Sequence, residues 1–337
     1  MNRSDPQPRR PRRRKRSWPR TILLIVFILA VLAGIYACLV RKPQVKPAPA
    51  GSTSQDVSSS SSVSSEPEPV KERKDDFFTI LVSGLDDDNG GSDTNILVGF
   101  DAKEQAITCV SIPRDTGVYI NGKSRKINYA YNLGGMDQMR ETVSDALGIP
   151  VDFTVEVNLK AFVKLVDEIG GVDFEVPLNM NYDDPYQDLH IHLKKGMQHL
   201  DGQNALKVVR FRHNNDGSGY GTEDIGRIGT QQAFLKAVAK QLLQIGNVKN
   251  IPALVDIFYT YVKTDLTTGN LVWLGNEALN IGTENIHFAT LPGDGSGYYN
   301  KQSVYVLDAQ ATCDLVNEAL NPYNEALTLE DMDILVP

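Results

Sequence analysis

Three arginines in the second half of the chain could bind a phosphorylated ligand. Arg210 and Arg212 flank the apolar Phe211, so in an extended segment both guanidinium groups leave the same face. Arg227 and Gln231 are four residues apart in a stretch of helical character, which places them one turn apart on one face. Guanidinium groups on rigid elements suit a phosphate or pyrophosphate, whose oxygens accept paired hydrogen bonds. Two plainer interpretations stay open for the first two arginines: a solvated face, or the end of a helix, where cations suit the dipole.

An acidic loop earlier in the chain could bind a divalent cation. Asp86, Asp87, Asp88 and Asp93 lie between two predicted strands. Mg²⁺ is usually held by one or two carboxylates together with substrate phosphates and water. Each of these four carboxylates is therefore a candidate ligand. Asp, Asn and Gly also build ordinary turns, so a simple turn is the alternative.

A second polar loop begins where the predicted strand at 106–112 ends. It contains Arg114 and Asp115, and Lys126 follows a few residues later. The ends of buried strands are common places for ligand-binding loops in α/β folds. Taken singly, Arg114 and Asp115 could also form a local salt bridge, and Lys126 could be a solvated strand end.

The histidines and cysteines give weaker signals. His190 and His192 share one face of a predicted strand at 189–193, but the sequence shows no third ligand at a suitable spacing. A partly exposed strand is therefore favoured over a metal site. Cys38, Cys109 and Cys313 are too few for a disulfide framework or a metal knuckle, and leave at most one bridge, between Cys109 and Cys313.

Strand and helix patterns alternate along the part of the chain that carries these residues. Short β-branched runs predict strands at 77–82, 94–100, 106–112, 151–157 and 172–176, with further strand-like runs at 286–291 and 303–307. Apolar periodicity and stop signals predict helices at 135–147, 159–169, 224–245, 250–262, 269–280 and 309–320. This order predicts an α/β fold, an α/β/α sandwich in which a mainly β central sheet is covered by helices on both faces.

The N-terminal end has the pattern of a membrane anchor. Residues 1–20 hold nine Lys or Arg against one acid, and residues 21–40 run for twenty residues without a charge. That length matches the hydrocarbon core of a bilayer, so we predict one transmembrane helix over 21–40. The basic residues before it predict a cytoplasmic tail at 1–20, which would contact anionic lipid, and an extracellular location for everything after Arg41. A cleaved signal peptide is the alternative.

A linker and one large domain follow the predicted helix. Residues 43–76 consist mainly of Pro, Ser, Glu and Lys, which predicts a disordered linker. Residues 77–337 show no second linker or repeat, so we predict a single domain there. The whole chain has a net charge of −8 although its first 42 residues are strongly basic. The predicted domain is therefore acidic, which argues against nucleic acid as a partner and for a focused anion site.

Six separate motifs resemble those of the LytR-CpsA-Psr proteins, in the order typical of that family. They are SIPRD (111–115), KINYAY (126–131), GGVD (170–173), GMQHLDGQNAL (196–206), VRFR (209–212) and GRIGTQQ (226–232). The resemblance extends over about 77–320, and the basic tail, single helix and polar linker are similar too. It implies a domain outside the membrane of a Gram-positive bacterium. It also implies Mg²⁺-assisted transfer of an anionic glycopolymer from an undecaprenyl pyrophosphate carrier to N-acetylmuramic acid of peptidoglycan.

The resemblance also implies roles for individual residues. The pyrophosphate ligands of the family fall on Arg114, Arg210, Arg212, Arg227 and Gln231, with Lys126 at the position of the basic residue of its motif. The metal-side aspartates fall on Asp93 and Asp86, and Asp87 or Asp88 could replace Asp86. From the mechanism of phosphoryl transfer, we expect either Asp93 or Asp115 to remove the proton from the acceptor sugar. Many relatives have an arginine where this chain has Gly91, so one phosphate contact would be missing or supplied elsewhere.

Two other functions fit parts of the sequence. A non-catalytic module for wall polymer or polyprenyl phosphate could use the same arginines without turnover. A membrane-tethered transcription regulator would place its basic tail on DNA, but the twenty residues of that tail contain no helix-turn-helix pattern. Release of carrier phosphate from a pyrophosphate-linked donor would distinguish the enzyme from the binding module.

Overall fold

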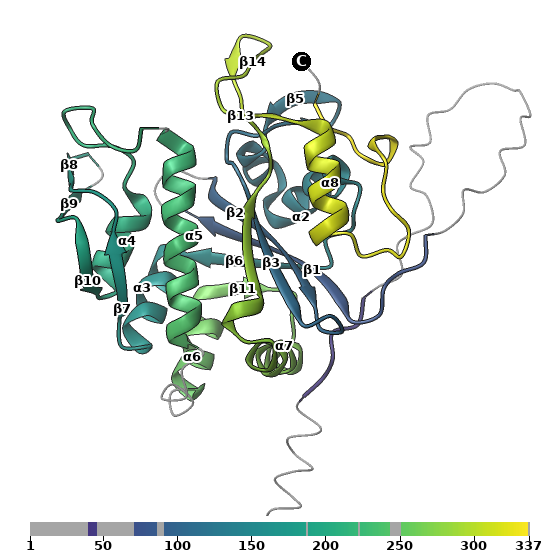
Figure 1. Cartoon of the computed structure of the whole chain (residues 1–337), viewed down its shortest axis with the longest axis horizontal. Coiled ribbons are helices and arrows are strands. Elements are labelled where there is room, and N and C mark those ends of the chain that lie inside the picture. The colour runs from purple at the N-terminus through teal and green to yellow at the C-terminus, as the bar shows by residue number, and fades with distance from the viewer. Residues whose placement is uncertain are drawn as a thin grey trace, which may run out of the picture.

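A mixed six-stranded sheet forms the centre of the fold (Figure 1). The computed structural model describes residues 40–45, 71–85, 91–186, 188–221, 223–242 and 251–335. The strand order is β11-β6-β1-β2-β3-β12. The strands of this sheet are β1 (Phe77–Leu85), β2 (Ser92–Asp101), β3 (Ala106–Ile112), β6 (Phe153–Asn158), β11 (Val262–Thr264) and β12 (Ile286–Thr290).

The directions of these strands decide where loops can meet. β1 pairs antiparallel with β2, β2 pairs antiparallel with β3, and β1 and β3 pair parallel with β6 and β12 respectively. β1, β3, β6 and β12 therefore all point the same way. Their carboxyl ends lie at one edge of the sheet, where ligands commonly bind in α/β folds.

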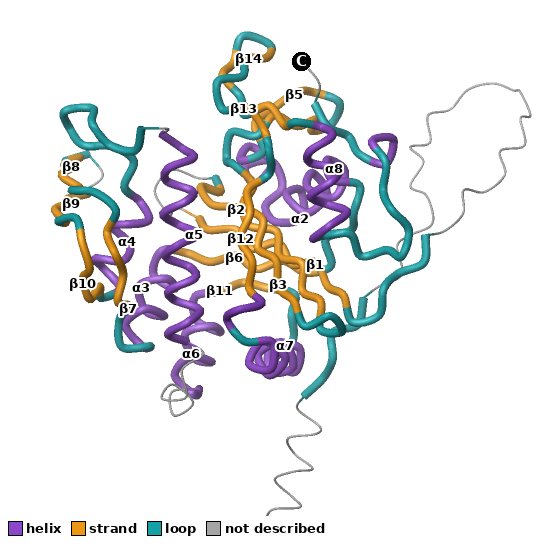
Figure 2. The backbone as a smooth tube through the Cα atoms, in the orientation of Figure 1, coloured by secondary structure: helices purple, strands orange, loops and turns teal. Residues whose placement is uncertain are grey.

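Seven described α-helices, together with short 3-10 turns, surround the strands (Figure 2). The α-helices are α2 (Asn128–Leu147), α3 (Leu159–Glu168), α4 (Gly202–Arg210), α5 (Glu223–Leu242), α6 (Ile251–Tyr261), α7 (Thr268–Ile281) and α8 (Ala309–Ala319), and the 3-10 turns are η2 (Thr283–Asn285) and η3 (Leu329–Asp331). The mixed α/β class and the helices predicted near α5, α6, α7 and α8 are confirmed.

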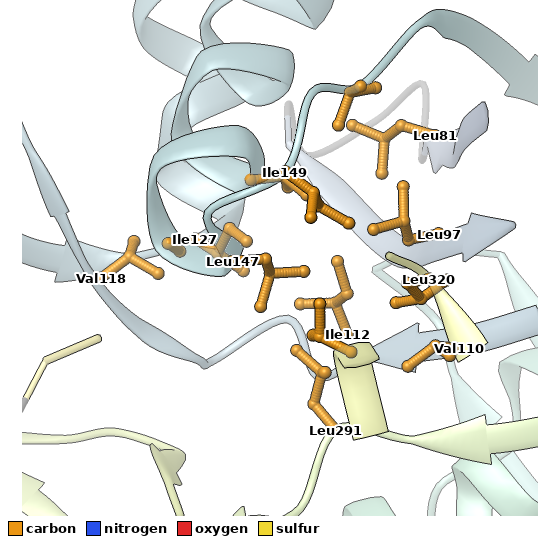
Figure 3. Packing of buried hydrophobic residues seen from close by; sticks show 14 of the residues in the cluster. Leu81, Leu97, Val110, Ile112, Val118, Ile127, Leu147, Ile149, Leu291 and Leu320 are labelled. Carbon is orange, nitrogen blue, oxygen red and sulfur yellow. The ribbon is translucent and has the colours of Figure 1, made fainter. Parts of the chain in front are cut away.

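Both faces of the sheet are apolar and covered by helices. Successive side chains of a strand point to opposite faces. Leu81 of β1 therefore packs on one side with Val143 of α2 and Val316 of α8. Phe78 of the same strand packs on the other side with Leu274 of α7. Figure 3 shows part of the first cluster, including Leu81, Leu97, Val110, Leu147 and Leu320.

A third apolar cluster joins α3, α4 and α5 to two antiparallel strand pairs beside the main sheet. It contains Val166, Phe174, Val208, Phe211 and Phe234, which are all buried. The pairs are β7 (Val172–Val176) with β10 (Gly196–Leu200), and the hairpin of β8 (Met180–Asp184) with β9 (Leu189–Leu193). In Figure 1 this part of the molecule lies to the left of the central sheet.

Several short strands and one helix differ from the sequence prediction. Sequence patterns did not predict β4 (Gly117–Ile120), β5 (Lys123–Lys126), β8, β10 or β11. The single strand predicted at 303–307 is two short strands, β15 (Gln302–Ser303) and β16 (Val306–Leu307), paired with β14 (Tyr298–Tyr299) and β13 (Gly293–Asp294). α2 begins seven residues before the predicted start at 135, because a first helical part precedes a kink at the non-helical Gly134 and Gly135, and the part after the kink matches the prediction.

The ends of the predicted linker contact the folded domain. Arg41 N donates to Gly269 O at 3.2 Å, and Val45 packs against the apolar cluster beneath α7. Arg73 forms an ion pair with Asp152, whose side chain is 2% exposed. Residues 46–70 lie outside the described residues, as do residues 1–39 with nearly all of the predicted membrane helix. Among the described helices, none combines the length and the hydropathy needed to cross a bilayer.

The two described cysteines are both free. Cys109 lies on β3 and Cys313 on α8, so the single bridge that the sequence left open is not formed. Burial raises the pKa of the Cys109 thiol to about 12. Since the thiolate is the reactive form, this thiol is inert at neutral pH.

Candidate active site

A cavity of about 390 Å³ opens at the carboxyl edge of the central sheet. Leu85 at the end of β1, Arg114 after β3 and Leu159 after β6 all line it. This is the position that the parallel strand directions define, because their carboxyl ends meet there. The polar and charged residues lining it include Asp93, Arg114, Asn128, Tyr182, Arg210, Arg212, His213, Arg227 and Gln231.

Arg210 and Arg212 reach the cavity from the end of a helix. The prediction of an extended segment is wrong for Arg210, which lies in the last turn of α4, and the alternative of a helix end is confirmed. Val208 and Phe211 are buried three residues apart, so the apolar spacing follows a helix and not a strand. At Phe211 the backbone becomes extended, with φ −63° and ψ 135°, and Arg212 follows outside the helix. The two guanidinium groups therefore leave a helix terminus and the loop beyond it.

α4 is fixed in place by its first residues. The Asp201 side chain accepts a hydrogen bond from Asn204 N at 2.8 Å and so caps the helix. Gly202 N donates to Asp167 Oδ1 at 2.7 Å. A Cβ atom on Gly202 would lie 2.2 Å from Val163 O, so only glycine allows α4 to approach α3 this closely. The motif at 196–206 thus positions the helix that carries Arg210.

α5 carries the next two cavity residues. Arg227 is 5% exposed and lies one turn before Gln231, as the four-residue spacing predicted. Gln231 Nε2 donates to Val209 O at 2.9 Å, which ties α5 to the last turn of α4. Gln231 therefore lines the cavity and also holds the two arginine-bearing helices together.

Gln232 attaches α5 to the sheet. Its Nε2 donates to Ser111 Oγ at 3.0 Å, Ala289 O at 2.7 Å and Thr290 Oγ1 at 3.0 Å. These acceptors belong to the carboxyl ends of β3 and β12. Because Gln232 fixes α5 at this edge, it fixes the height at which Arg227 enters the cavity.

A short chain of alternating charges runs from the cavity into the loop after β3. Arg114 Nη1 forms an ion pair with Asp93 Oδ1, and Arg114 Nε lies 3.6 Å from Asp115 Oδ1. Lys126 Nζ lies 3.2 Å from Asp115 Oδ2. Arg114 and Asp93 line the cavity, whereas Asp115 and Lys126 are not among the described residues that do. Asp115 is therefore placed to orient Arg114 from the side away from the cavity.

The acidic loop is only partly described. Asp86, predicted as a metal ligand, and its possible replacements Asp87 and Asp88 lie outside the described residues. Asp93 is described: its side chain is 40% exposed and lines the cavity. Gly91, two residues before Asp93, has φ +128°, a conformation that side-chain-bearing residues rarely adopt. The backbone here thus disfavours the arginine that the family resemblance implies at this position.

Three further lining residues were missed by sequence reasoning. Asn128 begins α2 and belongs to the motif at 126–131, so its position in that motif was an available signal. Tyr182 and His213 carried no such signal. They come together because the β8–β9 hairpin packs beside the loop after Arg212, with their rings 5.5 Å apart and nearly perpendicular. Tertiary packing alone brings these two to the cavity.

The electrostatics of the cavity favour a multiply charged anion. Four arginines from three parts of the chain line the cavity. They are Arg114 in the loop after β3, Arg210 and Arg212 at the end of α4 and just beyond it, and Arg227 in α5. Among the described lining residues, Asp93 is the single carboxylate that opposes them. Arginine presents planar groups of N–H donors that match phosphate oxygens. The arrangement can therefore bind a pyrophosphate and stabilise negative charge that develops on it.

Known proteins are similar to this chain in sequence and in fold. Residues 48–321 match the LytR_cpsA_psr family. The chain belongs to that family. The Bacillus cereus polyisoprenyl-teichoic acid–peptidoglycan teichoic acid transferase TagU is 34% identical over 256 residues, which are 74% of this chain and 80% of the relative.

Two solved structures have a similar fold. The crystal structure of B. subtilis TagV matches with a TM-score of 0.61 at 27% identity, over 78% of this chain and 100% of that one. The structure of TagT bound to LIIa-WTA matches with a TM-score of 0.60 at 26% identity, over 76% of this chain and 95% of that one. The mixed α/β architecture is therefore shared with these proteins.

Proposed function

We propose that this protein transfers an anionic glycopolymer from an undecaprenyl pyrophosphate carrier to N-acetylmuramic acid of peptidoglycan. The observation that carries the proposal is the convergence of Arg114, Arg210, Arg212 and Arg227 on one cavity. Teichoic acid is the polymer named for the relative TagU, and a capsular polysaccharide presents the same sugar–pyrophosphate linkage. The transferred group is a sugar phosphate in both cases.

The reaction forms one bond at the sugar-side phosphorus and breaks another. The acceptor hydroxyl oxygen bonds to this phosphorus, and the bond from it to the bridging oxygen breaks. The polyprenyl monophosphate leaves with the electron pair. Positioning and charge neutralisation supply most of the catalysis in such a phosphoryl transfer. The four arginines of the cavity supply both, since they hold the pyrophosphate and stabilise the leaving phosphate.

We assign to Asp93 the role of general base, which removes the proton from the acceptor hydroxyl. Asp93 lines the cavity beside Arg114, whereas Asp115 lies in an ion pair with Lys126 behind it. A general base must come within hydrogen-bond reach of the proton that it removes. Asp115 and Lys126 then act through Arg114, by holding its guanidinium group toward the cavity.

The donor set also fits Mg²⁺. A cavity-lining carboxylate next to a phosphate-binding site is the arrangement in which Mg²⁺ is usually held. Asp93 would hold the ion together with Asp86, which lies outside the described residues. When bound, Mg²⁺ would add positive charge against the pyrophosphate oxygens.

The proposal includes a membrane location for the protein. A carrier with a polyprenyl tail stays in the lipid bilayer, so the enzyme must work at the membrane surface. A transmembrane helix at 21–40, with the N-terminus in the cytoplasm, would anchor a catalytic domain of residues 77–337 on the extracellular side. The ends of the intervening segment contact the domain near α7 and near β1, as Arg41 and Arg73 show.

Turnover of a defined donor tests the proposal. The purified full-length chain is mixed with a polyprenyl pyrophosphate-linked glycopolymer and peptidoglycan, and released polyprenyl monophosphate is measured. Release that depends on peptidoglycan supports the transferase. Saturable binding of the donor without release would instead show a non-catalytic binding module and overturn the proposal.

A further inference from the structure

The β8–β9 hairpin presents a second cluster of polar side chains outside the cavity. In its register Asp183 stands opposite His190, and Asn181 stands opposite His192. All four are exposed, whereas Ile191 between the histidines is buried in the apolar cluster beneath. Alternation along a strand therefore puts the four polar groups on one outward face.

Three metal-ligating atoms converge on this face. Asp183 Oδ1 lies 2.5 Å from His190 Nδ1 and 3.2 Å from His192 Nε2. The ligating atoms of Asp183, His190 and His192 all lie within 4.8 Å of one another. The side chains are about half exposed, at 46%, 52% and 56% respectively. No sequence pattern indicated this third ligand, since Asp183 reaches the histidines only through strand pairing.

Asn181 fixes the orientation of the His192 ring. His192 Nδ1 lies 2.7 Å from Asn181 Oδ1, and the other ring nitrogen, Nε2, lies 3.2 Å from Asp183 Oδ1. A partner that fixes the second ring nitrogen in this way is a regular feature of metal-binding histidines.

A His–Asp pair elsewhere in the chain provides a matched comparison. His199 on β10 stands opposite Asp173 on β7, with His199 Nδ1 2.8 Å from Asp173 Oδ1. This pair is also exposed and lies across two antiparallel strands. It belongs to none of the three-ligand groups found among the described residues. A difference in metal binding between the two strand pairs thus isolates the effect of the converging ligands.

We propose that Asp183, His190 and His192 form a binding site for a divalent transition metal of the zinc type. Two imidazoles and one carboxylate are the ligands that Zn²⁺ accepts, with remaining positions left to water. Mg²⁺ and Ca²⁺ prefer sites made of oxygen ligands alone. The site is thus distinct in chemistry from the proposed Mg²⁺ position at Asp93, and it rests on the hairpin geometry, independent of the proposed transferase activity.

A metal here would brace one wall of the cavity. Asp183 N donates to Asn215 Oδ1 at 2.7 Å, and Asn181 N donates to Asn214 Oδ1 at 2.6 Å. Both asparagines lie in the loop directly after Arg212, and the inward-facing Tyr182 lines the cavity. Holding the two strands together at their outer face therefore also holds the loop that carries Arg212.

Direct metal titration tests the proposal. The full-length chain, without a polyhistidine tag and stripped with a chelator, is titrated with ZnCl₂ in excess Mg²⁺, and Co²⁺ absorption reports the ligand geometry. We expect binding that His192→Ala or Asp183→Asn weakens by more than about 100-fold, since loss of a partner behind a ligand already costs about 10–100-fold. His199→Ala should leave it unchanged. Equal binding by wild type and His192→Ala, or equal weakening by His199→Ala, would overturn the site.

Thermal unfolding separates metal binding from misfolding. Because the three side chains are exposed, the melting temperatures of the variants without metal should match that of the wild type. Added Zn²⁺ should raise the melting temperature of the wild type and of His199→Ala, but not that of His190→Ala. A rise in His190→Ala as large as in the wild type would contradict the proposal. No glycopolymer is present in either experiment, so their failure leaves the proposed transferase untouched.

Discussion

Exchanging Arg210 or Arg212 for lysine separates a phosphate-binding role from a merely charged surface. Lysine keeps the positive charge and the favourable interaction with the end of α4, but it loses the planar group of five donors. A site that binds pyrophosphate oxygens in pairs must therefore lose hydrogen bonds and activity on the exchange. A solvated helix end would not, because its interaction depends on charge alone.

The magnitude follows from the position of the two side chains. Both line the cavity, Arg210 from the last turn of α4 and Arg212 from the loop beyond it. Loss of one donor aimed at developing charge typically reduces turnover by about 10²–10³-fold. We expect Arg210→Lys and Arg212→Lys each to lower kcat/KM for transfer by about 10² or more, which corresponds to about 3 kcal/mol of transition-state stabilisation. The free energy of unfolding should change by less than about 0.5 kcal/mol, since Arg212 is exposed and Arg210 keeps its charge.

The assay measures release of polyprenyl monophosphate from a pyrophosphate-linked donor, together with urea unfolding of each variant. Arg125→Lys is the matched control, because Arg125 stacks on the Tyr129 ring at 5.6 Å and is not among the described residues lining the cavity. Near-normal transfer by both Arg210→Lys and Arg212→Lys would refute the pyrophosphate site. Loss of activity in proportion to a large loss of stability would point to a structural role instead.

Four further outcomes are expected. Asp93→Ala should abolish transfer and weaken its dependence on Mg²⁺ in a metal titration, with the far-UV circular dichroism unchanged; undiminished turnover would remove both roles from this residue. Gln232→Ala should destabilise the protein in urea by about 0.5–1.5 kcal/mol, because partly buried acceptors at the sheet edge lose their donor, and should lower kcat; wild-type stability would show that α5 is held otherwise. Arg73→Ala should cost about 3–5 kcal/mol in the same assay, since it leaves the buried Asp152 carboxylate without its cation; a loss below about 0.5 kcal/mol would mean that residues 71–76 act as a linker. A reporter fused after Pro337 should be active only outside the cytoplasm, and cytoplasmic activity would contradict the proposed topology.

Local patterns in the sequence determined the fold class and the helices of the C-terminal half. Apolar residues at helical spacing predicted the helices that correspond to α5, α6, α7 and α8 within a few residues. β1 was equally clear, because a strand buried on both faces reads as a continuous apolar run. Such signals are local, since a helix or strand repeats its contacts every few residues. The cation-rich motifs at 209–212 and 226–232 were visible for the same reason.

The same local reasoning was wrong where two structures share a pattern. Alternation around Phe211 suggested a strand, yet the burial of Val208 and Phe211 has helical spacing and Arg210 is helical. In a stretch this short both periods fit the same few residues, and the packing of α4 on α3 decides between them. Propensity gives a weak preference that tertiary contacts override.

The candidate site itself depended on long-range pairing. The parallel alignment of β1 with β6 and of β3 with β12 brings the loop of Arg114 beside Arg210 and Arg227, which lie about a hundred residues later. No local pattern encodes that register, nor the hairpin pairing that sets Asp183 against two histidines. The sequence therefore determined which residues could bind phosphate and which elements would carry them. Only the tertiary structure decided which of them meet, because strand direction and helix packing follow from the burial of the whole core and from no single segment.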